Sequence, residues 1–485
     1  MQLFFPDFTN SFLKSSYKIF FGEEDINSIN NNSLSIVFPV ENYKADPFDY
    51  DFYGKQILSN VFDSLVVLDK NFRIKPSLAY SYGLISDNVW NFRLRKNVKF
   101  HNSMELTFSD VEKTFEFAKN SQFLSTFISS IDKLEKIDDF EFNIITKYPD
   151  PLLLSKLTML YIVPFDFSYE NQFIGTGRFV YDKKVLNELF LYPSQDSWCG
   201  QSKIKEIKVI FEEDANNRID LFLEGDADFL AFVPHGAIPI IRQYGFNVIS
   251  LPSLEVQSLM FNLNSKIFSD KANRKTFASM IDKNDILNRF ASYLTISSQF
   301  VGSGVFGFNP NIAFPLMTDS EIHESINNFP SLNVILVLPQ NLELLANVLK
   351  NQLSKYGINL VLKLVSEDNL LNEIPNADLF FMSFKTDLGD LGDFLSSVVK
   401  SDSKNNFQNF KNLEIDELIL MSEQNLLVFE RLKLLQEIMK LVVEDYVIGI
   451  PLFEYDVFYA FNKNLSFEPS LNGLIDFNEI KFNDN

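Results

Sequence analysis

The stretch NVILVLPQNLELLANVLKNQLSKYGINLVLKLV, residues 333–365, decides the fold class. Its first six residues, 333–338, form an apolar run that is typical of a buried strand. Residues 345–356 then place apolar side chains at helical spacing, and Gly357 is suited to end that helix. Between residues 358 and 364, apolar and polar residues alternate, which predicts a second strand. Strand, helix and strand joined by short connections form a βαβ unit, so we expect parallel strands and an α/β fold.

Further elements are predicted on the C-terminal side of this unit. Residues 378–384 form another apolar strand, which leads into the acidic loop DLGDLGD, residues 387–393. Apolar residues between 432 and 446 step by three or four, which predicts a long amphipathic helix. Residues 448–461 then favour a β-rich return of the chain. The acidic loop follows a strand end, where ligands bind in open α/β sheets.

The N-terminal half also shows ordered patterns, with short strands predicted at 34–40, 65–68 and 90–95. Ser109 and Glu112 have the spacing of a capping box, so we expect a helix to begin at Ser109. A second helix is predicted from an Asp214 cap to Gly225, a residue that tolerates the left-handed conformation. The chain shows neither an internal repeat nor a long linker, so the predicted domains interleave in sequence.

The composition excludes several classes of function. The 485 residues include 43 Lys and Arg against 64 Asp and Glu, which gives a formal net charge of −21. An acidic chain does not suit nucleic acid, whose phosphates require basic surfaces, so we expect no nucleic-acid partner. A single cysteine, Cys199, rules out cysteine-based metal clusters, and three histidines lie far apart at His101, His235 and His323. We therefore expect no metal and no cofactor.

Targeting signals are not evident in the sequence. No stretch approaches the roughly 20 apolar residues that a membrane span needs. The first 32 residues contain aromatic and acidic residues, without the basic start and apolar core of a signal peptide. On these residues alone, the chain is expected to be cytosolic or already to have lost an export signal.

Two motifs suggest chemistry, and each has a simpler explanation. Residues 302–307 match G-x-G-x-x-G, but Pro310 follows and prevents the helix that a dinucleotide site needs, so a tightly turning loop is favoured. Asp387, Asp390 and Asp393 could hold Ca²⁺ or act as a pair of hydrolytic carboxylates, although the spacing of a calcium loop is absent. His101 is expected to be structural, because no nucleophile motif accompanies it.

Several short segments follow one another at 60–70, 75–79, 92–101, 106–111, 175–179, 196–198, 224–228 and 261–264 with Arg274. In this order they resemble segments of the family-5 extracellular solute-binding proteins of ABC importers, the relatives of oligopeptide- and dipeptide-binding proteins. Each segment is weakly specific, but their order and spacing together are specific and cover nearly the whole chain after residue 33. The family's glycine after histidine is Ser103 here, and its tryptophan before the binding acid is Phe384.

The resemblance implies a two-lobed, periplasmic-binding-protein-like (type II) α/β fold. It implies an N-terminal lobe at 1–60, 166–254 and 452–485, an extra subdomain at 61–165 and a second lobe at 255–451. Two strands would cross between the lobes as a hinge near 251–255 and 450–453. The lobes would close on a ligand without making or breaking a bond, so no enzymatic activity is expected.

The resemblance also implies a ligand and its partners. A peptide would add as a strand beside residues 383–387, and Asp387 would pair with its α-ammonium group. The site residues expected from the family are Asp387, Phe384, Ser383, Lys385 and, on the facing lobe, Glu41. The expected partners are a membrane permease and its ATPase, and the expected location is extracytoplasmic, with the chain itself a monomer. A nickel complex, an oligosaccharide or another solute remains an alternative ligand, and a hydrolase using the three aspartates an alternative function.

Overall fold

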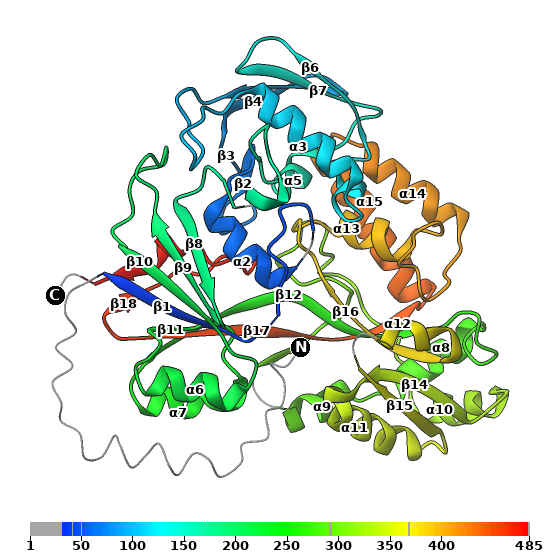
Figure 1. Cartoon of the computed structure of the whole chain (residues 1–485). Helices are drawn as coiled ribbons and strands as arrows, with labels where there is room; N and C mark the ends of the chain where they lie inside the picture. Colours follow the sequence, from blue (N-terminus) through cyan, green and yellow to red (C-terminus); the bar gives the residue numbers. More distant parts are fainter. Residues whose placement is uncertain are drawn as a thin grey trace, which may run out of the picture. The chain divides into compact units, whose positions relative to one another are not determined.

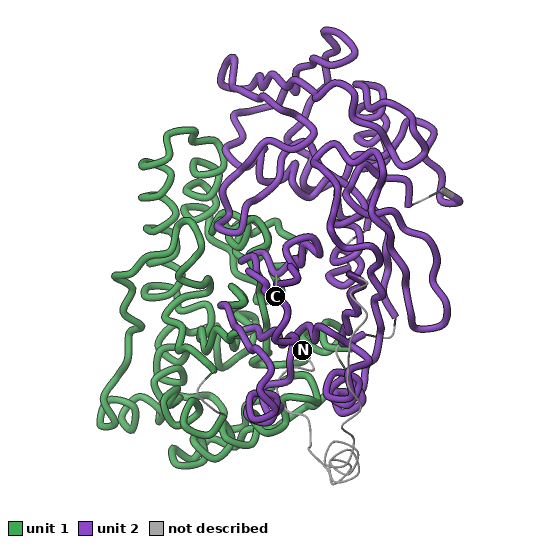
Figure 2. The backbone as a smooth tube through the Cα atoms, turned by 90° about the vertical axis from the view of Figure 1, so that its left-hand side faces the viewer, with its two compact units in different colours: residues 1, 252–456 green, residues 2–251, 457–485 purple. Residues whose placement is uncertain are grey.

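The computed structural model describes residues 32–40, 42–49, 51–171, 173–290, 293–366 and 369–483 (Figure 1). The chain divides into two compact units, of which unit 1 comprises residues 252–456. Unit 2 comprises the described residues before 252 and those after 456, so the chain passes between the units twice (Figure 2). The two long strands that contain these crossings are β12 (Asn247–Phe261) and β17 (Gly449–Phe461).

Unit 1 is built on strands in the order β15-β14-β16-β12-β17, with β13 pairing with β17. Its strands and helices are α8 Lys271–Ser279, α9 Lys283–Phe290, β13 Leu294–Ile296, α10 Asp319–Ser325, β14 Asn333–Pro339, α11 Glu343–Ser354, β15 Asn359–Val365, α12 Leu370–Glu373, β16 Leu379–Lys385, α13 Leu391–Phe394, α14 Leu413–Gln424 and α15 Val428–Lys440.

Unit 2 has strands in the order β17-β11-β1-β10-β9-β8 and a separate four-stranded sheet, β4-β5-β7-β6. Its elements are β1 Ser33–Phe38, α2 Phe52–Val61, β2 Val66–Leu68, β3 Ile74–Pro76, β4 Ala79–Ser86, β5 Val89–Leu94, α3 Phe108–Asn120, α4 Leu124–Phe127, β6 Ile131–Lys136, β7 Glu141–Thr146, α5 Leu153–Leu157, β8 Phe179–Val185, β9 Glu188–Pro193, β10 Glu206–Phe211, α6 Ala215–Leu223, β11 Phe229–Leu230, α7 Ile238–Gln243, β18 Leu465–Ser466 and β19 Lys481–Phe482.

The predicted βαβ unit is confirmed. Strands β14 and β15 pair in parallel from Asn333↔Asn359 to Pro339↔Val365, with α11 between them in sequence. Gly357 has a φ of +80°, so it provides the left-handed residue after the helix. The long helix near the C-terminus is also present as α15, and it continues as a π-helical turn at Leu441–Asp445.

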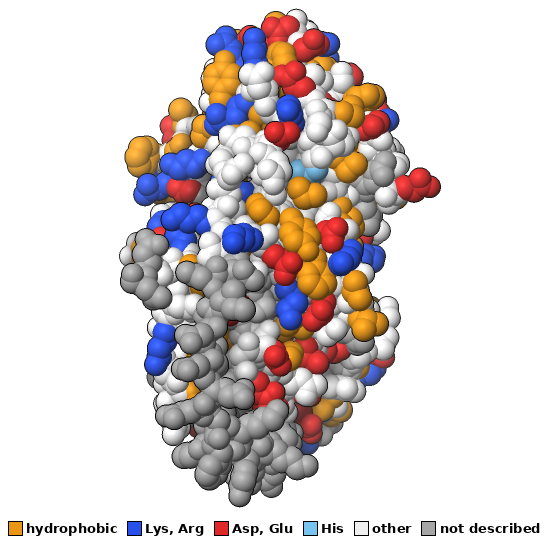
Figure 3. Space-filling model, turned by 60° about the vertical axis from the view of Figure 1, so that its left-hand side comes forward, with side chains coloured by type: hydrophobic (Ala, Val, Ile, Leu, Met, Phe, Trp, Pro, Cys, Tyr) orange, Lys and Arg blue, Asp and Glu red, His pale blue; other side chains and the backbone are white. Residues whose placement is uncertain are grey.

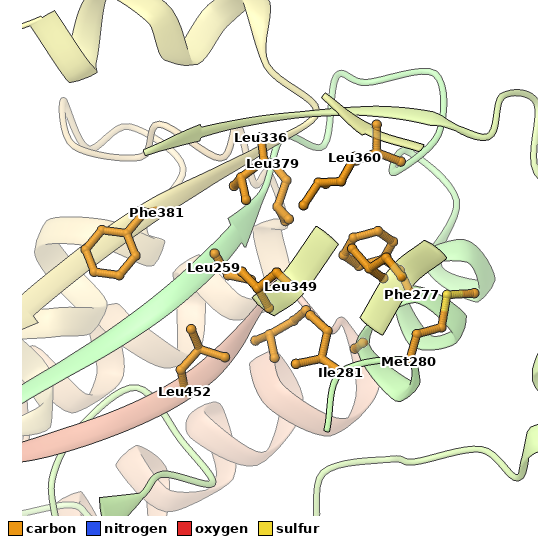
Figure 4. Packing of buried hydrophobic residues seen from close by; sticks show 14 of the residues in the cluster. Leu259, Phe277, Met280, Ile281, Leu336, Leu349, Leu360, Leu379, Phe381 and Leu452 are labelled. Carbon is orange, nitrogen blue, oxygen red and sulfur yellow. The ribbon is translucent and has the colours of Figure 1, made fainter. Parts of the chain in front are cut away.

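The core of unit 1 lies on both faces of its sheet. On one face, leucines of the strands pack with residues of α8 and α11, as Figure 4 shows for Leu336, Leu360 and Leu349. On the other face, Phe380 and Met260 pack with residues of α13 and α15. Odd-numbered residues of β16 therefore face the first cluster and even-numbered residues the second, because side chains alternate along a strand.

One predicted helix start is wrong. Helix α3 begins at Phe108 after Thr107, not at Ser109. The carboxylate of Asp110 accepts hydrogen bonds from the backbone N–H of Thr107 at 2.7 Å and of Phe165 at 2.8 Å. The capping pair is thus Thr107 and Asp110, two residues earlier than the Ser109–Glu112 pair that the spacing predicts. The Asp214 cap of α6 is confirmed, since its carboxylate accepts from the backbone N–H groups of Asn216 and Asn217.

Both signs of charge occur on the surface. On the face drawn in Figure 3, Asp and Glu side chains are interspersed with Lys and Arg, and hydrophobic side chains lie between them. Among the described residues, no helix combines the length and the apolar character needed to cross a bilayer.

Candidate functional site

The candidate site begins with strand β16, whose two halves differ. Leu379, Phe380 and Phe381 are buried, whereas residues 382–385 are partly exposed. Strand β12 pairs with β16 along its whole length, from Phe261↔Leu379 to Glu255↔Lys385. Strand β14 pairs with the other edge only at Leu379 and Phe380. Within the described residues, that edge therefore has no strand partner beyond Phe380, and its backbone groups can pair with another extended chain.

Asp387 follows the end of this strand and is partly buried. Its side chain is 24% exposed, and its Oδ1 lies 3.9 Å from Nζ of Lys385, whose side chain is 19% exposed. The structure therefore brings two of the predicted site residues together as an ion pair at the limit of direct contact. A charge pair with this little exposure is screened by solvent less than a surface pair.

Ser383 belongs to a small network that the sequence did not reveal. Its hydroxyl donates to Oε1 of Glu255, and the phenolic hydroxyl of Tyr455 donates to Oε2 of Glu255 at 2.7 Å. Glu255 is the antiparallel partner of Lys385, so the two side chains lie on the same face of the sheet. Glu255 and Tyr455 are far from β16 in sequence. The sequence analysis considered their segments only as parts of the expected hinge, near 251–255 and 450–453.

Phe384 points to the other face of the sheet. Its ring packs edge-on against Phe394, with the ring centroids 5.2 Å apart, and Phe394 stacks on Phe300 at 5.3 Å. Phe384 is thus part of the apolar wall on that face while remaining partly exposed.

Three buried polar atoms near this strand end have no hydrogen-bond partner within the described structure. They are Oγ1 of Thr386, Nε2 of Gln257 and Oε1 of Glu454, which lie beside β16, on β12 and on β17. Thr386 is fully buried and Gln257 is 2% exposed. Leaving such groups unsatisfied is costly, so they are suited to bind water or a ligand.

Glu454 sits in an unusually tight position. Burial raises the pKa of its carboxyl, and a hydrogen bond from the backbone of Leu254 opposes that rise. A Cβ atom at position 302 would lie 2.3 Å from Oε1 of Glu454, so a larger residue there would displace this carboxylate. The glycine motif at 302–307 is therefore a loop that packs against β17, and it opens no helix.

The three aspartates of the acidic loop have different environments. Asp390 is buried, forms a two-point ion pair with Arg431 with both N···O distances 2.7 Å, and caps α13 through the N–H of Gly392. Oδ1 of Asp393 accepts from Ser397 at 3.5 Å. Across the described ranges, no group of three or more His, Cys, Asp or Glu is arranged to hold a metal ion.

The other residues that the sequence analysis considered lie in unit 2 or outside the described residues. Glu41 lies outside the described residues. His101 is in unit 2, where its Nδ1 accepts from Gly175 at 3.4 Å and its Nε2 lies 2.9 Å from the carbonyl oxygen of Gly177. Burial lowers the pKa of His101, which favours a neutral imidazole that links two loop segments.

Comparisons with known proteins place the chain among solute-binding proteins. The model of the bacterial extracellular solute-binding proteins, family 5 (middle), matches residues 73–406. The nickel-binding protein NikA of Staphylococcus aureus is 24% identical over 438 residues, covering 85% of this chain and 86% of that protein. The dipeptide-binding protein DppE of Bacillus subtilis is 21% identical over 471 residues, covering 86% of each.

The solved structures show the fold. One is the ABC transporter-associated periplasmic binding protein DppA of Helicobacter pylori in complex with the peptide STSA. It has a TM-score of 0.79 with this chain at 17% identity, and the match covers 93% of this chain and 98% of that one. The predicted two-lobed, periplasmic-binding-protein-like α/β fold is thereby confirmed.

Proposed function

Because this chain belongs to the bacterial extracellular solute-binding proteins of family 5, we propose that it is the substrate-binding component of an ABC importer and that its ligands are short peptides. The observation that supports a peptide is the edge of β16 beyond Phe380, which has no strand partner in the described residues and is followed by Asp387. Backbone pairing along such an edge gives affinity that is largely independent of side-chain identity.

Asp387 is proposed to bind the α-ammonium group of the peptide. An ammonium group that leaves water needs a fixed anion, because its lost hydration is otherwise uncompensated. Asp387 is suited to this role, since it is partly buried and yet retains 24% of its side-chain exposure. Asp390 is not, because Arg431 already occupies both of its oxygens.

The other expected site residues receive narrower proposed roles. Phe384 provides an apolar wall, Lys385 modifies the charge beside Asp387, and Ser383 holds Glu255 in place through its hydroxyl. Glu41 is proposed to face the ligand from the other lobe, and closure of the lobes over the ligand stays a prediction from the family. The three-part domain division predicted from the sequence also stays a prediction.

The partners and location follow from the family. Solute-binding proteins of this family act outside the cytoplasm, and we propose that this chain delivers its ligand to a membrane permease driven by an ATPase. Binding a ligand and delivering it to a permease requires no bond to be made or broken on this chain. The monomeric state is likewise a proposal.

A nickel complex is the second candidate ligand. The observation that favours it is the similarity to the nickel-binding protein NikA of Staphylococcus aureus, which is comparable to the similarity to the dipeptide-binding relative. The peptide is preferred because an open strand edge recognises a polyamide backbone, which a metal complex with small ligands does not offer at length.

Native mass spectrometry of the purified protein tests the ligand class directly. We expect adducts whose masses match peptides and whose fragments are amino-acid residues. An adduct with the isotope pattern of nickel would instead support the second candidate. Turnover of a peptide or glycoside library by the purified protein would contradict a pure binding function.

A further inference from the structure

We propose that Lys385 competes with the ligand for Asp387 and thereby sets how strongly the site prefers a free amino group. This inference rests on the proposed peptide-binding function and goes beyond it, because it assigns a specificity-determining role to a cation inside the site. The pair that carries it is Nζ of Lys385 and Oδ1 of Asp387, 3.9 Å apart.

The electrostatic argument starts from this pair. With Lys385 beside it, Asp387 is a compensated charge before any ligand arrives. A ligand ammonium that approaches Asp387 meets a like charge at close range, and like charges at such distances repel appreciably when little water screens them. The ammonium of the ligand therefore has to replace that of Lys385, rather than add to it.

Glu255 offers the displaced lysine a second position. It lies directly opposite Lys385 on β12, on the same face of the sheet. Side chains that face each other in this way have Cβ atoms roughly 5 Å apart, well within reach of a lysine. The hydroxyls of Ser383 and Tyr455 each use one acceptor position of the Glu255 carboxylate, and a carboxylate has about four.

Binding is thus an exchange of two ammonium groups between two carboxylates. The ligand takes Asp387, and Lys385 turns to Glu255, so each of the two ammonium groups faces a carboxylate in the bound state. The hydroxyls of Ser383 and Tyr455 both donate to the Glu255 carboxylate. They hold it on the face of the sheet that Lys385 shares, where the displaced lysine can reach it.

The test is a double-mutant cycle with titration calorimetry, using tetra-alanine and N-acetyl-tetra-alanine as probes because neither has a charged side chain. The variants are Lys385→Met, Glu255→Gln and the two combined. Lys363→Met is the matched control, since Lys363 is another strand lysine of unit 1 with its own carboxylate partner, Glu373.

We expect Lys385→Met to tighten the binding of tetra-alanine about tenfold or more and to leave the acetylated probe within about twofold. Glu255→Gln should weaken tetra-alanine binding severalfold when Lys385 is present and have no such effect in the Lys385→Met background. The control should behave as the unaltered protein does.

Two outcomes separate the inference from the function on which it rests. If the unaltered protein prefers tetra-alanine over the acetylated probe but Lys385→Met leaves that preference unchanged, the competition is wrong and the peptide function stands. If the unaltered protein binds neither probe, the peptide function itself fails. An equal effect of Glu255→Gln in both backgrounds would overturn the movement of Lys385 to Glu255.

Discussion

Asp387 and Asp390 stand three residues apart in one loop, and the structure treats them in opposite ways. Asp390 is buried, and its two oxygens are held by Arg431 while Oδ1 also caps α13. Asp387 keeps about a quarter of its side chain exposed, with a lysine 3.9 Å away. The first carboxylate is committed to the fold, whereas the second is the one that we propose for binding the ligand.

The difference shows how one short acidic segment can serve both stability and recognition. A buried charge with a fixed partner cannot exchange that partner without a large cost. A partly exposed charge exchanges its partner at a lower cost, because water compensates part of its charge. Loss of Asp390 should therefore unfold the protein more readily, and loss of Asp387 should impair binding.

The largest expected effect is that of Asp390→Ala. Removing one member of a buried ion pair leaves the other charge uncompensated, so we expect a loss of about 3–5 kcal/mol in the free energy of unfolding. Urea denaturation followed by circular dichroism measures it. Asp390→Asn is the control and should lose less, because its amide oxygen can still accept from the N–H of Gly392.

Asp387→Ala should give the reverse result. The binding of tetra-alanine is expected to weaken by about 2–5 kcal/mol, because the buried ammonium loses its anion. The free energy of unfolding should change by no more than about 0.5 kcal/mol, as for an ordinary partly exposed residue. A large loss of stability with unchanged binding would reverse the two assignments.

Lys283 extends the comparison to a cation whose pKa owes nothing to a carboxylate. Its Nζ donates to the carbonyl of Ser297 and lies over the ring of Phe314. Burial lowers its pKa from 10.5 to about 8, so between these values the unfolded chain binds more protons than the folded one. Stability contributed by this group therefore rises with pH across that range.

Replacing Lys283 by Met should remove the penalty of burying the charge. At pH 7 the variant is expected to be more stable by up to about 3 kcal/mol, and the difference should vanish near pH 10.5. Thermal denaturation of both proteins between pH 7 and 10.5 checks this, since other titrating groups are common to the two. A difference independent of pH would show that the side chain is charged equally in both states.

The smallest expected effect is that of Asp110→Ala, because the groups that donate to its carboxylate are uncharged. Asp110→Ala leaves the N–H groups of Thr107 and Phe165 without their acceptor and should cost about 1–3 kcal/mol of unfolding free energy. Glu112, which the sequence pattern favoured as the capping acid, is exposed, and Glu112→Ala should change stability by less than about 0.5 kcal/mol. Similar losses for both would restore the sequence-based assignment.

The elements that the sequence predicted well are those with long, regular patterns. The apolar periods around 333–365 define β14, α11 and β15, and local packing did not override them. The start of α3 was missed because two acids, Asp110 and Glu112, both have capping positions available. Asp110 accepts from the nearby N–H of Thr107 and also from the N–H of Phe165, a donor far away in sequence that no local pattern reveals.

The candidate site was only partly predictable. Asp387 and its neighbours on β16 are one continuous segment, so a family resemblance can locate them. Glu255, Tyr455 and Glu454 come to that segment from strands far away in sequence, through the pairing of β12 with β16 and the position of β17 beside β12. No local pattern encodes such a register, because it depends on the whole sheet.

The most direct test of the account is the affinity of the unaltered protein for one peptide with and without its amino group. Titration calorimetry with tetra-alanine and its N-acetylated form should show a preference of at least about tenfold for the free amine, which corresponds to about 1.4 kcal/mol. Equal affinities for the two peptides would contradict an ammonium site at Asp387.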